Sequence, residues 1–179
     1  MRTFLLAALA GAALALPALP AKAVDSVSLE LGTGDATDMG RIGLQWKWDS
    51  RWLAGGGWHL GGYWDAQLGY WKSRPGGGVS GNSIVDFGIT PVFRYQRDDG
   101  RGFYVEGAIG FHYLSKKEIN ANRRFSTNFQ FGDHVGAGFR FGGRNEWDAS
   151  IRLQHLSNGS IKRPNPGINF LQLRLQHHF

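Results

Sequence analysis

Alternation of apolar and polar residues with a period of two limits the fold of this 179-residue chain more than any other feature. Leu171, Leu173 and Leu175, for example, are separated by Gln172 and Arg174. This period places successive side chains on opposite faces of a β-strand, whereas a helix needs a period of about 3.6. Eight segments follow the pattern: residues 27–31, 41–48, 58–70, 86–95, 103–113, 125–141, 147–154 and 171–179. Brief Gly, Asp and Asn turns or longer polar stretches connect them, so we predict an all-β chain.

The two faces of these segments distinguish between two kinds of small barrel. The apolar face carries Trp and Phe rings that would crowd the lumen of an eight-stranded barrel. The polar face carries Arg, Glu, Asp, Gln and His side chains, which can pair with one another inside a small lumen. Each segment with its connection takes about 20 residues, which suits a tilted membrane strand and its turn. We therefore predict an eight-stranded antiparallel transmembrane β-barrel, with a secreted lipocalin-like barrel as the alternative.

Residues 1–23 differ from the rest of the chain. Arg2 precedes a long apolar stretch, and Ala21 and Ala23 are small residues where a signal peptidase accepts them. We expect residues 1–23 to be a signal peptide that is removed, and residues 24–179 to form one barrel domain. A buried N-terminal helix is the alternative. No later apolar run approaches the roughly 18 to 20 residues of a membrane-spanning helix.

The expected location is the bacterial outer membrane, with both chain ends in the periplasm. Periplasmic turns are then expected at 49–57, 96–100 and 142–145, and outer loops at 73–83, 115–124 and 158–167. The chain contains no Cys, so it has no disulfide bonds. Its formal net charge of +6 includes two cations of the leader and is spread along the chain, which argues against nucleic acid as a partner.

Two polar residues lie on the same lipid-facing side as the apolar residues of the seventh segment. His155 and Ser157 follow Leu153 at intervals of two, on a face where an ionisable side chain is unfavourable. Residues i and i+2 of a strand lie about 6.5 to 7 Å apart. An imidazole and a hydroxyl at this spacing can act as general base and nucleophile. The alternative is that the strand ends at the headgroup level, where polar residues belong.

Three more polar residues accompany this pair. Asn165 lies between two prolines, which fix the path of the loop, so its amide could be held over Ser157. Asn169 is two residues before Leu171, so it faces outward like the apolar residues of the last segment. Asp133 faces outward with the apolar residues of the sixth segment. Pairing of the sixth and seventh segments across the 142–145 turn sets Asp133 opposite Leu153 or His155.

The segments FGDHVGAGFRFG and HLSNGSIKRPNPGI, at residues 131–142 and 155–168, resemble the outer-membrane lipid A 3-O-deacylases. The resemblance covers the whole mature chain in architecture and is most specific over residues 131–179. It implies an eight-stranded barrel with a Ser-His-acid site on its lipid-facing wall. It also implies a serine esterase that removes the ester-linked acyl chain at position 3 of lipid A in the outer leaflet, without a metal or other cofactor.

The resemblance implies a role for several positions. Ser157 matches the nucleophile and His155 the general base, while Asn158 and Asn165 match two conserved asparagines of the family pattern. The oxyanion hole is then the Asn165 amide, with the backbone N–H of Asn158 or Gly159.

The chain departs from the family at Asn169, which stands where the family has a glutamate. Either this neutral amide orients His155, or Asp133 supplies the missing charge. From the sequence alone we expect Asp133→Asn to cost more activity than Asn169→Ala.

Two other functions fit parts of the sequence. One is an outer-membrane phospholipase-type esterase, which is usually larger, dimeric and calcium-dependent. The other is a non-enzymatic eight-stranded membrane barrel, in which the polar residues on the wall are incidental. The expected partners are lipid A or lipopolysaccharide and the outer-membrane lipids, and a homodimer stays open.

Overall fold

The computed structural model describes residues 23–75 and 82–179. The expected signal peptide, residues 1–23, lies outside this range except for its last residue. No helix in the described part of the chain is long and apolar enough to cross a membrane.

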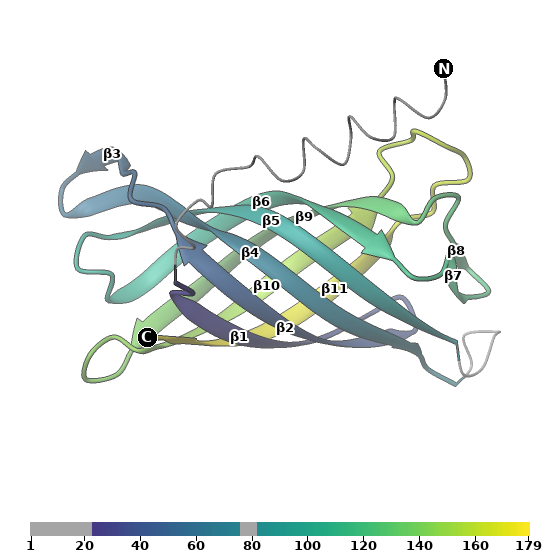
Figure 1. Ribbon diagram of the computed structural model, residues 1–179, viewed down its shortest axis with the longest axis horizontal. Coiled ribbons are helices and arrows are strands. Elements are labelled where there is room, and N and C mark those ends of the chain that lie inside the picture. The colour runs from purple at the N-terminus through teal and green to yellow at the C-terminus, as the bar shows by residue number, and fades with distance from the viewer. Residues whose placement is uncertain (1–22, 76–81) are drawn as a thin grey trace, which may run out of the picture.

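Eight long strands form a closed antiparallel barrel, as predicted (Figure 1). They are β1 Ser26–Gly34, β2 Thr37–Lys47, β4 Trp58–Ser73, β5 Ser83–Arg97, β6 Gly102–Leu114, β9 Phe129–Phe141, β10 Trp147–Ser157 and β11 Ile168–His178. Their order around the wall is β2-β1-β11-β10-β9-β6-β5-β4, and β2 also pairs with β4. The first strand, β1, pairs with the last, β11, and this pairing closes the ring. Closure leaves no unpaired edge along the barrel wall.

Burial alternates along each strand and confirms the predicted faces. Leu171, Leu173 and Leu175 are 45 to 62% exposed, whereas Gln172 and Arg174 between them are 1 and 2% exposed. The wall is therefore apolar outside and polar inside. A soluble barrel has the opposite arrangement, so the lipocalin-like alternative is wrong.

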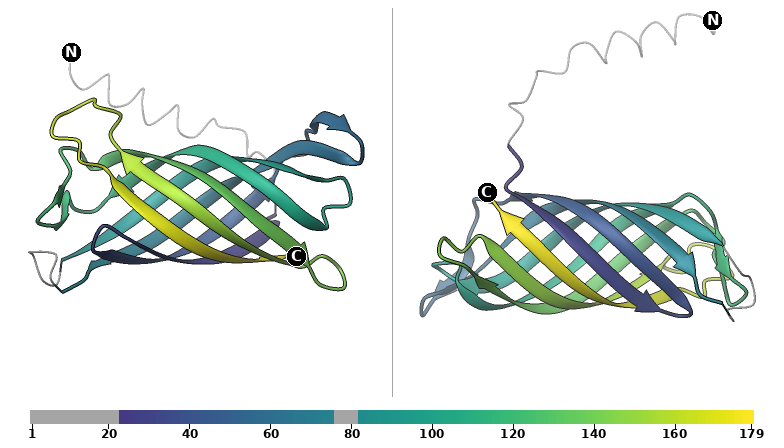
Figure 2. Two further views of the ribbon diagram at one scale, coloured as in Figure 1. Left: turned by 180° about the vertical axis from the view of Figure 1, so that it is seen from behind. Right: turned by 90° about the horizontal axis from the view of Figure 1, so that it is seen from below.

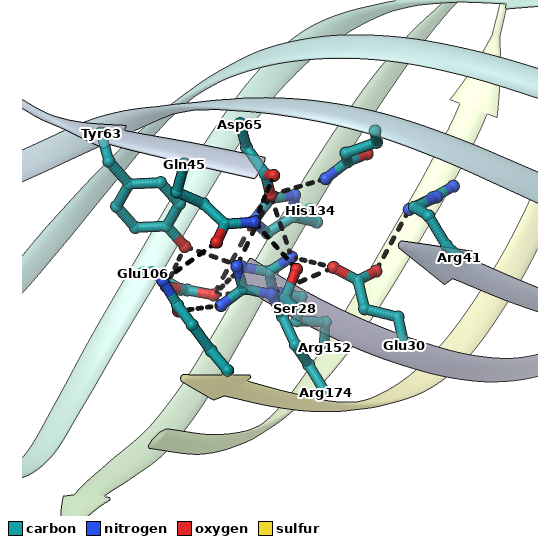
Figure 3. Close-up of polar contacts among 12 residues, drawn as sticks. Ser28, Glu30, Arg41, Gln45, Tyr63, Asp65, Glu106, His134, Arg152 and Arg174 are labelled. Carbon is teal, nitrogen blue, oxygen red and sulfur yellow. Dashed lines mark hydrogen bonds and ion pairs between the residues drawn. The ribbon is translucent and has the colours of Figure 1, made fainter. Parts of the chain in front are cut away.

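The centre of the lumen is filled by a network of ion pairs, as expected (Figure 3). Arg152 donates from Nε to Glu106 at 2.7 Å, from Nη1 to Glu30 at 2.8 Å and from Nη2 to the Tyr63 hydroxyl at 2.8 Å. Arg41 also reaches Glu30, at 3.3 Å. Each buried carboxylate thus faces at least one guanidinium, which offsets the cost of removing both from water.

The outer end of the lumen is apolar, which the alternation did not predict. Trp71 and Phe170 meet there edge to face, with ring centroids 5.0 Å apart. The cluster consists of Met39, Trp71, Ile84, Leu114, Ile119, Phe125, Leu156, Ile168 and Phe170. Phe125 was expected on the outer wall, but β9 begins only at Phe129, and Phe125 is buried in this cluster.

The connections divide between the two ends of the barrel as the predicted orientation requires (Figure 1). The C-terminus and the turns after β2, β5 and β9 lie at one end. The first of these turns contains the short strand β3 Trp52–Gly55, which pairs with β4. The connections after β6 and β10 lie at the other end, together with the β1–β2 turn. There β7 Glu118–Asn120 and β8 Arg123–Arg124 form a small hairpin between β6 and β9.

Candidate active site

Three neighbouring strands bring the predicted polar residues together on the outer wall. In the strand register, His155 of β10 lies opposite Asn169 of β11 and opposite Asp133 of β9. Figure 2 (left) shows β10 and β11 side by side, with the 158–167 connection at the end away from the C-terminus. The inward neighbours Leu156 and Ile168 are fully buried in the apolar cluster. This packing holds the outward-facing residues on a rigid support.

A hydrogen bond joins the imidazole of His155 to the side chain of Asn169. The distance from His155 Nδ1 to Asn169 Oδ1 is 2.7 Å. The amide oxygen can only accept, so Nδ1 carries the proton and Nε2 is left with a free lone pair. His155 is therefore held in the tautomer that a general base requires.

Asp133 shares the face of His155 without contacting it. Its carboxylate is exposed, and among the described residues it forms no hydrogen bond or ion pair. Of the two partners that the sequence left open for Asp133, Leu153 and His155, the register selects His155. The Nδ1 contact, however, is made by Asn169, so the geometry favours Asn169 as the residue that orients the imidazole.

Ser157 ends β10 on the same face as His155 and is half-buried. Within the described part of the chain its Oγ makes no hydrogen bond, so no bond to His155 has formed. The two side chains are neighbours on one strand, about 6.5 to 7 Å apart at Cα. Bonds between a catalytic base and its nucleophile often tighten only when substrate binds.

The loop at 158–167 is held in place by the buried side chain of Asn158. Its Nδ2 donates to Ser126 Oγ and to the Lys162 carbonyl oxygen, both at 2.7 Å. Its backbone N–H donates to Asn165 Oδ1 at 3.0 Å. Asn158 is thus not the free backbone donor that the sequence had led us to expect, and instead it positions Asn165.

Two donors near Ser157 remain without a partner. Because the Asn165 oxygen faces the Asn158 N–H, the Nδ2 group of Asn165 is turned away from that bond. Neither Asn165 Nδ2 nor the backbone N–H of Gly159 donates to another group in the described part of the chain. Both stand in the loop that follows Ser157, where an oxyanion donor is needed.

A shallow pocket of about 530 Å³ opens beside His155. Its polar edge contains Asp133, His155 and Asn169 together with the β1–β2 turn, and its apolar part contains Val135, Leu153 and Leu171. Ser157 lies just beyond this lining, towards the loop. In the described residues no group of three or more His, Cys, Asp or Glu side chains could hold a metal ion.

Sequence reasoning missed Gly167, which contacts the imidazole of His155. Gly167 is buried and has φ of +60°. A Cβ there would lie 2.6 Å from His155 Cε1 and 3.2 Å from Nε2. The Pro-Gly dipeptide before β11 marked only a turn, because the fit against the ring depends on the rotamer of His155.

Sequence reasoning also missed Asp35, which lies in the two-residue turn between β1 and β2. Asp35 and Ala36 have φ of 48° and 55°, as in the tight turns of β-hairpins. The turn is distant from β11 in the chain, but closure of the barrel pairs β1 with β11. Asp35 consequently lines the pocket beside His155.

The family model and the sequence relatives that match this chain all describe one enzyme family. Residues 38–178 match the family model for lipid A 3-O-deacylase (PagL). The lipid A deacylase PagL of Pseudomonas aeruginosa is 32% identical over 154 residues, which cover 86% of this chain and 85% of that protein. The lipid A deacylase PagL of Bordetella bronchiseptica is 34% identical over 160 residues, covering 86% and 83%.

Solved structures agree with the sequence relatives. The crystal structure of the outer-membrane enzyme PagL superposes with a TM-score of 0.74 at 29% identity, covering 86% of this chain and 99% of that one. A de novo designed transmembrane β-barrel, 11% identical with a TM-score of 0.52, covers 88% and 98% and shares the fold alone.

Proposed function

Because this chain belongs to the lipid A 3-O-deacylase (PagL) family of outer-membrane enzymes, we propose that Ser157 and His155 are the nucleophile and general base of its ester hydrolysis. The chain is a lipid A 3-O-deacylase of the outer membrane, and lipid A is its substrate. One observation carries the proposed site: the 2.7 Å contact of His155 Nδ1 with Asn169, which leaves Nε2 free to take a proton.

The first half of the reaction forms an acyl-enzyme. Ser157 Oγ attacks the carbonyl carbon of the ester, and its proton passes to His155 Nε2. The same proton then passes to the oxygen of the departing sugar hydroxyl, and the acyl group stays on Ser157. Asn169 accepts a hydrogen bond from Nδ1–H throughout, which keeps the imidazole in place.

The second half uses water. His155 Nε2 takes a proton from a water molecule, whose oxygen attacks the acyl-serine carbonyl. The bond between the carbonyl carbon and Ser157 Oγ then breaks, His155 returns the proton to Oγ, and the free fatty acid leaves. In both halves the carbonyl oxygen becomes an oxyanion. Asn165 Nδ2 and the Gly159 N–H are the donors that remain free to stabilise it, and a single such donor can contribute about 10² to 10³-fold in rate.

The position of the site on the outer wall suits a substrate embedded in the outer leaflet. The apolar part of the pocket, formed by Val135, Leu153 and Leu171, continues the lipid-facing surface of the strands. An acyl chain lying along this wall brings its ester to the level of His155. Lipid A therefore need not leave the membrane to react.

The export signal and the membrane barrel occupy separate parts of the chain in this proposal. Residues 1–23 serve as the export signal, and residues 24–179 as the barrel. The hydrolysis needs no metal or other cofactor, because Ser157 and His155 supply the nucleophile and the base themselves. A homodimer stays a prediction.

A serine-directed fluorophosphonate with a long alkyl chain tests the nucleophile directly. We expect one phosphonyl group on the peptide that contains Ser157, with loss of deacylation in parallel, and we expect both results to persist in EDTA. Mass spectrometry of the digested protein locates the label. Labelling at another residue would refute the nucleophile, and a loss of activity in EDTA that calcium restores would favour the phospholipase-type alternative.

Gly167→Ala should lower deacylation by about 10 to 100-fold, because the new methyl group displaces the imidazole and displacements of about 1 Å can have that effect. The backbone is also strained by a side chain at φ of +60°. The rate of fatty-acid release from lipid A in detergent micelles measures the change.

Gly56→Ala is the matched control for this substitution. Gly56 has φ of +61°, a Cβ there meets nothing within 4 Å, and the residue lies in the connection at the opposite end of the barrel. Its activity should equal that of the unaltered protein. Equal activity of Gly167→Ala would show that the contact with His155 does not position the ring.

A further inference from the structure

The turn between β1 and β2 is bonded to the residue that orients His155. Asp35 Oδ2 accepts a hydrogen bond from the backbone N–H of Asn169 at 2.8 Å. The side chain of the same Asn169 accepts from His155 Nδ1. A continuous path of two hydrogen bonds and one residue therefore connects the carboxylate of Asp35 with the imidazole.

The backbone of the turn also packs directly against Asn169. A Cβ on Gly34 would overlap the carbonyl oxygen of Asn169, so only glycine allows this approach. Further along the same strands, Thr33 lies opposite Leu171 in the register. The distance between the turn and the site is thus fixed by the closure of the barrel.

Two residues of the β7–β8 hairpin also donate hydrogen bonds to Asp35. Arg123 of β8 donates from Nη2 to Asp35 Oδ1 at 2.6 Å, and Asn120 of β7 donates to the Asp35 carbonyl oxygen at 2.8 Å. Partial burial alone would raise the pKa of Asp35. The hydrogen bond from Asn169 and the charge of Arg123 outweigh it, with a smaller contribution from His155, and lower the pKa below its ordinary value. Asp35 is therefore ionised at neutral pH.

We propose that Asp35 is a positioning residue for the deacylation, which anchors Asn169 and supplies the negative charge that the neutral Asn169 side chain lacks. This inference rests on the proposed function of His155 and Ser157. During the reaction His155 becomes an imidazolium, and an amide stabilises this cation less than a carboxylate does. Asp35 provides a carboxylate one residue away from the amide.

The charged groups around the imidazole come from three elements. The β1–β2 turn contributes Asp35, β9 contributes the exposed Asp133, and β8 contributes Arg123 on the far side of Asp35. Of the two carboxylates, only Asp35 is hydrogen-bonded to the residue that contacts Nδ1. This connection is why Asp35, rather than Asp133, is assigned the role.

Asp35→Asn separates charge from shape. The new amide oxygen still accepts from the Asn169 N–H, while the negative charge and the hydrogen bond that Oδ1 accepts from Arg123 Nη2 are lost. We expect kcat for lipid A deacylation to fall about 10-fold with KM changed less than about 2-fold, because the charge acts on the imidazolium and not on substrate binding. The acidic limb of the pH–rate profile should move to lower pH, since loss of a nearby anion disfavours the protonated imidazole.

Asp38→Asn is the matched control. Asp38 lies on the same hairpin and loses the same charge, but it is exposed and bonds Thr33 Oγ1 at 2.7 Å, away from Asn169. Its kcat and pH profile should match those of the unaltered protein. Heat-dependent mobility on a gel checks that each variant is a folded barrel.

A carboxylate placed directly on the imidazole should make Asp35 dispensable. In the double variant Asp35→Asn with Asn169→Asp, the new carboxylate contacts Nδ1 itself, and kcat should return to within about 3-fold of the original value. A residue that only held the turn in shape would not be rescued in this way.

Three outcomes would overturn the inference: an unchanged kcat in Asp35→Asn, an equal loss in Asp38→Asn, or no rescue in the double variant. A larger loss in Asp133→Asn than in Asp35→Asn would transfer the role to Asp133. Ser157→Ala in the same assay tests the proposed active site separately from the role of Asp35. If Ser157→Ala is inactive and Asp35→Asn is unaffected, only the role of Asp35 fails. If Ser157→Ala is active, the proposed site itself fails.

Discussion

Ser157→Ala will abolish deacylation while the barrel folds and inserts normally. The substitution removes the only atom that forms the acyl-enzyme bond, so kcat should fall by about 10³-fold or more. Ser157 Oγ makes no hydrogen bond in the described part of the chain, and its loss therefore leaves no buried group unpaired. Mass spectra of lipid A from cells that express the variant should show the fully acylated form.

His155→Ala should cost as much as Ser157→Ala, because the serine is a weak nucleophile without its base. Residues that act as one unit are not additive, so the double variant should be no worse than either single one. A double variant that is much slower than both would show that His155 and Ser157 act in separate steps.

Two substitutions control for side-chain loss alone. Ser160→Ala removes an exposed hydroxyl from the same loop, and His177→Ala removes an imidazole from the outer face of β11 at the opposite end, where it packs against Trp147. Both should retain activity. Release of the acyl chain by Ser157→Ala or His155→Ala would mean that the chemistry is performed elsewhere.

The barrel could be predicted from the sequence because its physical cause is local. A lipid-facing wall and a small polar lumen impose a period of two on every strand, and this period is visible without knowledge of the partner strands. The length of the 142–145 turn limited the register to within two residues, so Asp133 could be placed opposite either Leu153 or His155, and the structure selects His155.

Features that depend on the loops could not be predicted in this way. Phe125 has the same parity as Phe129 in the sequence, yet it lies in the apolar cluster because the chain bends between them. Parity is informative only along a continuous strand. The apolar outer end of the lumen was hidden for the same reason, since part of it comes from the β6–β9 connection.

The candidate site could be derived from the sequence where its residues lie on one strand, and not where their contacts depend on closure of the barrel. His155 and Ser157 are two residues apart, and their shared face follows from parity alone. The choice between Asn169 and Asp133 needed the direction of a hydrogen bond, which the strand register does not determine. Asp35 is far from both in the chain, and its contact with Asn169 exists only because β1 closes the barrel against β11.

Arg152→Met should destabilise the barrel by about 3 to 5 kcal/mol, because removing one partner leaves buried carboxylates without full compensation. Arg152 is fully buried and contacts Glu30, Glu106 and Tyr63 at 2.7 to 2.8 Å. Methionine fills similar volume but offers no donor. Glu106 then keeps Arg94 at 2.8 Å and Glu30 keeps Arg41 at 3.3 Å, so the loss is partial. Urea unfolding in lipid vesicles measures the change.

An exposed ion pair provides the control for the buried network of Arg152. Arg97 and Asp99 lie 3.4 Å apart in a turn, and both side chains are more than half exposed. Arg97→Met should therefore cost at most about 1 kcal/mol, since exposed ion pairs contribute little. Arg152→Lys keeps the charge but loses the forked geometry and should fall between the two. Because Arg152 points into the lumen and His155 out of it, the folded fraction of each variant should deacylate lipid A at the original rate. An equal effect of Arg152→Met and Arg97→Met would mean that the lumen network does not stabilise the barrel.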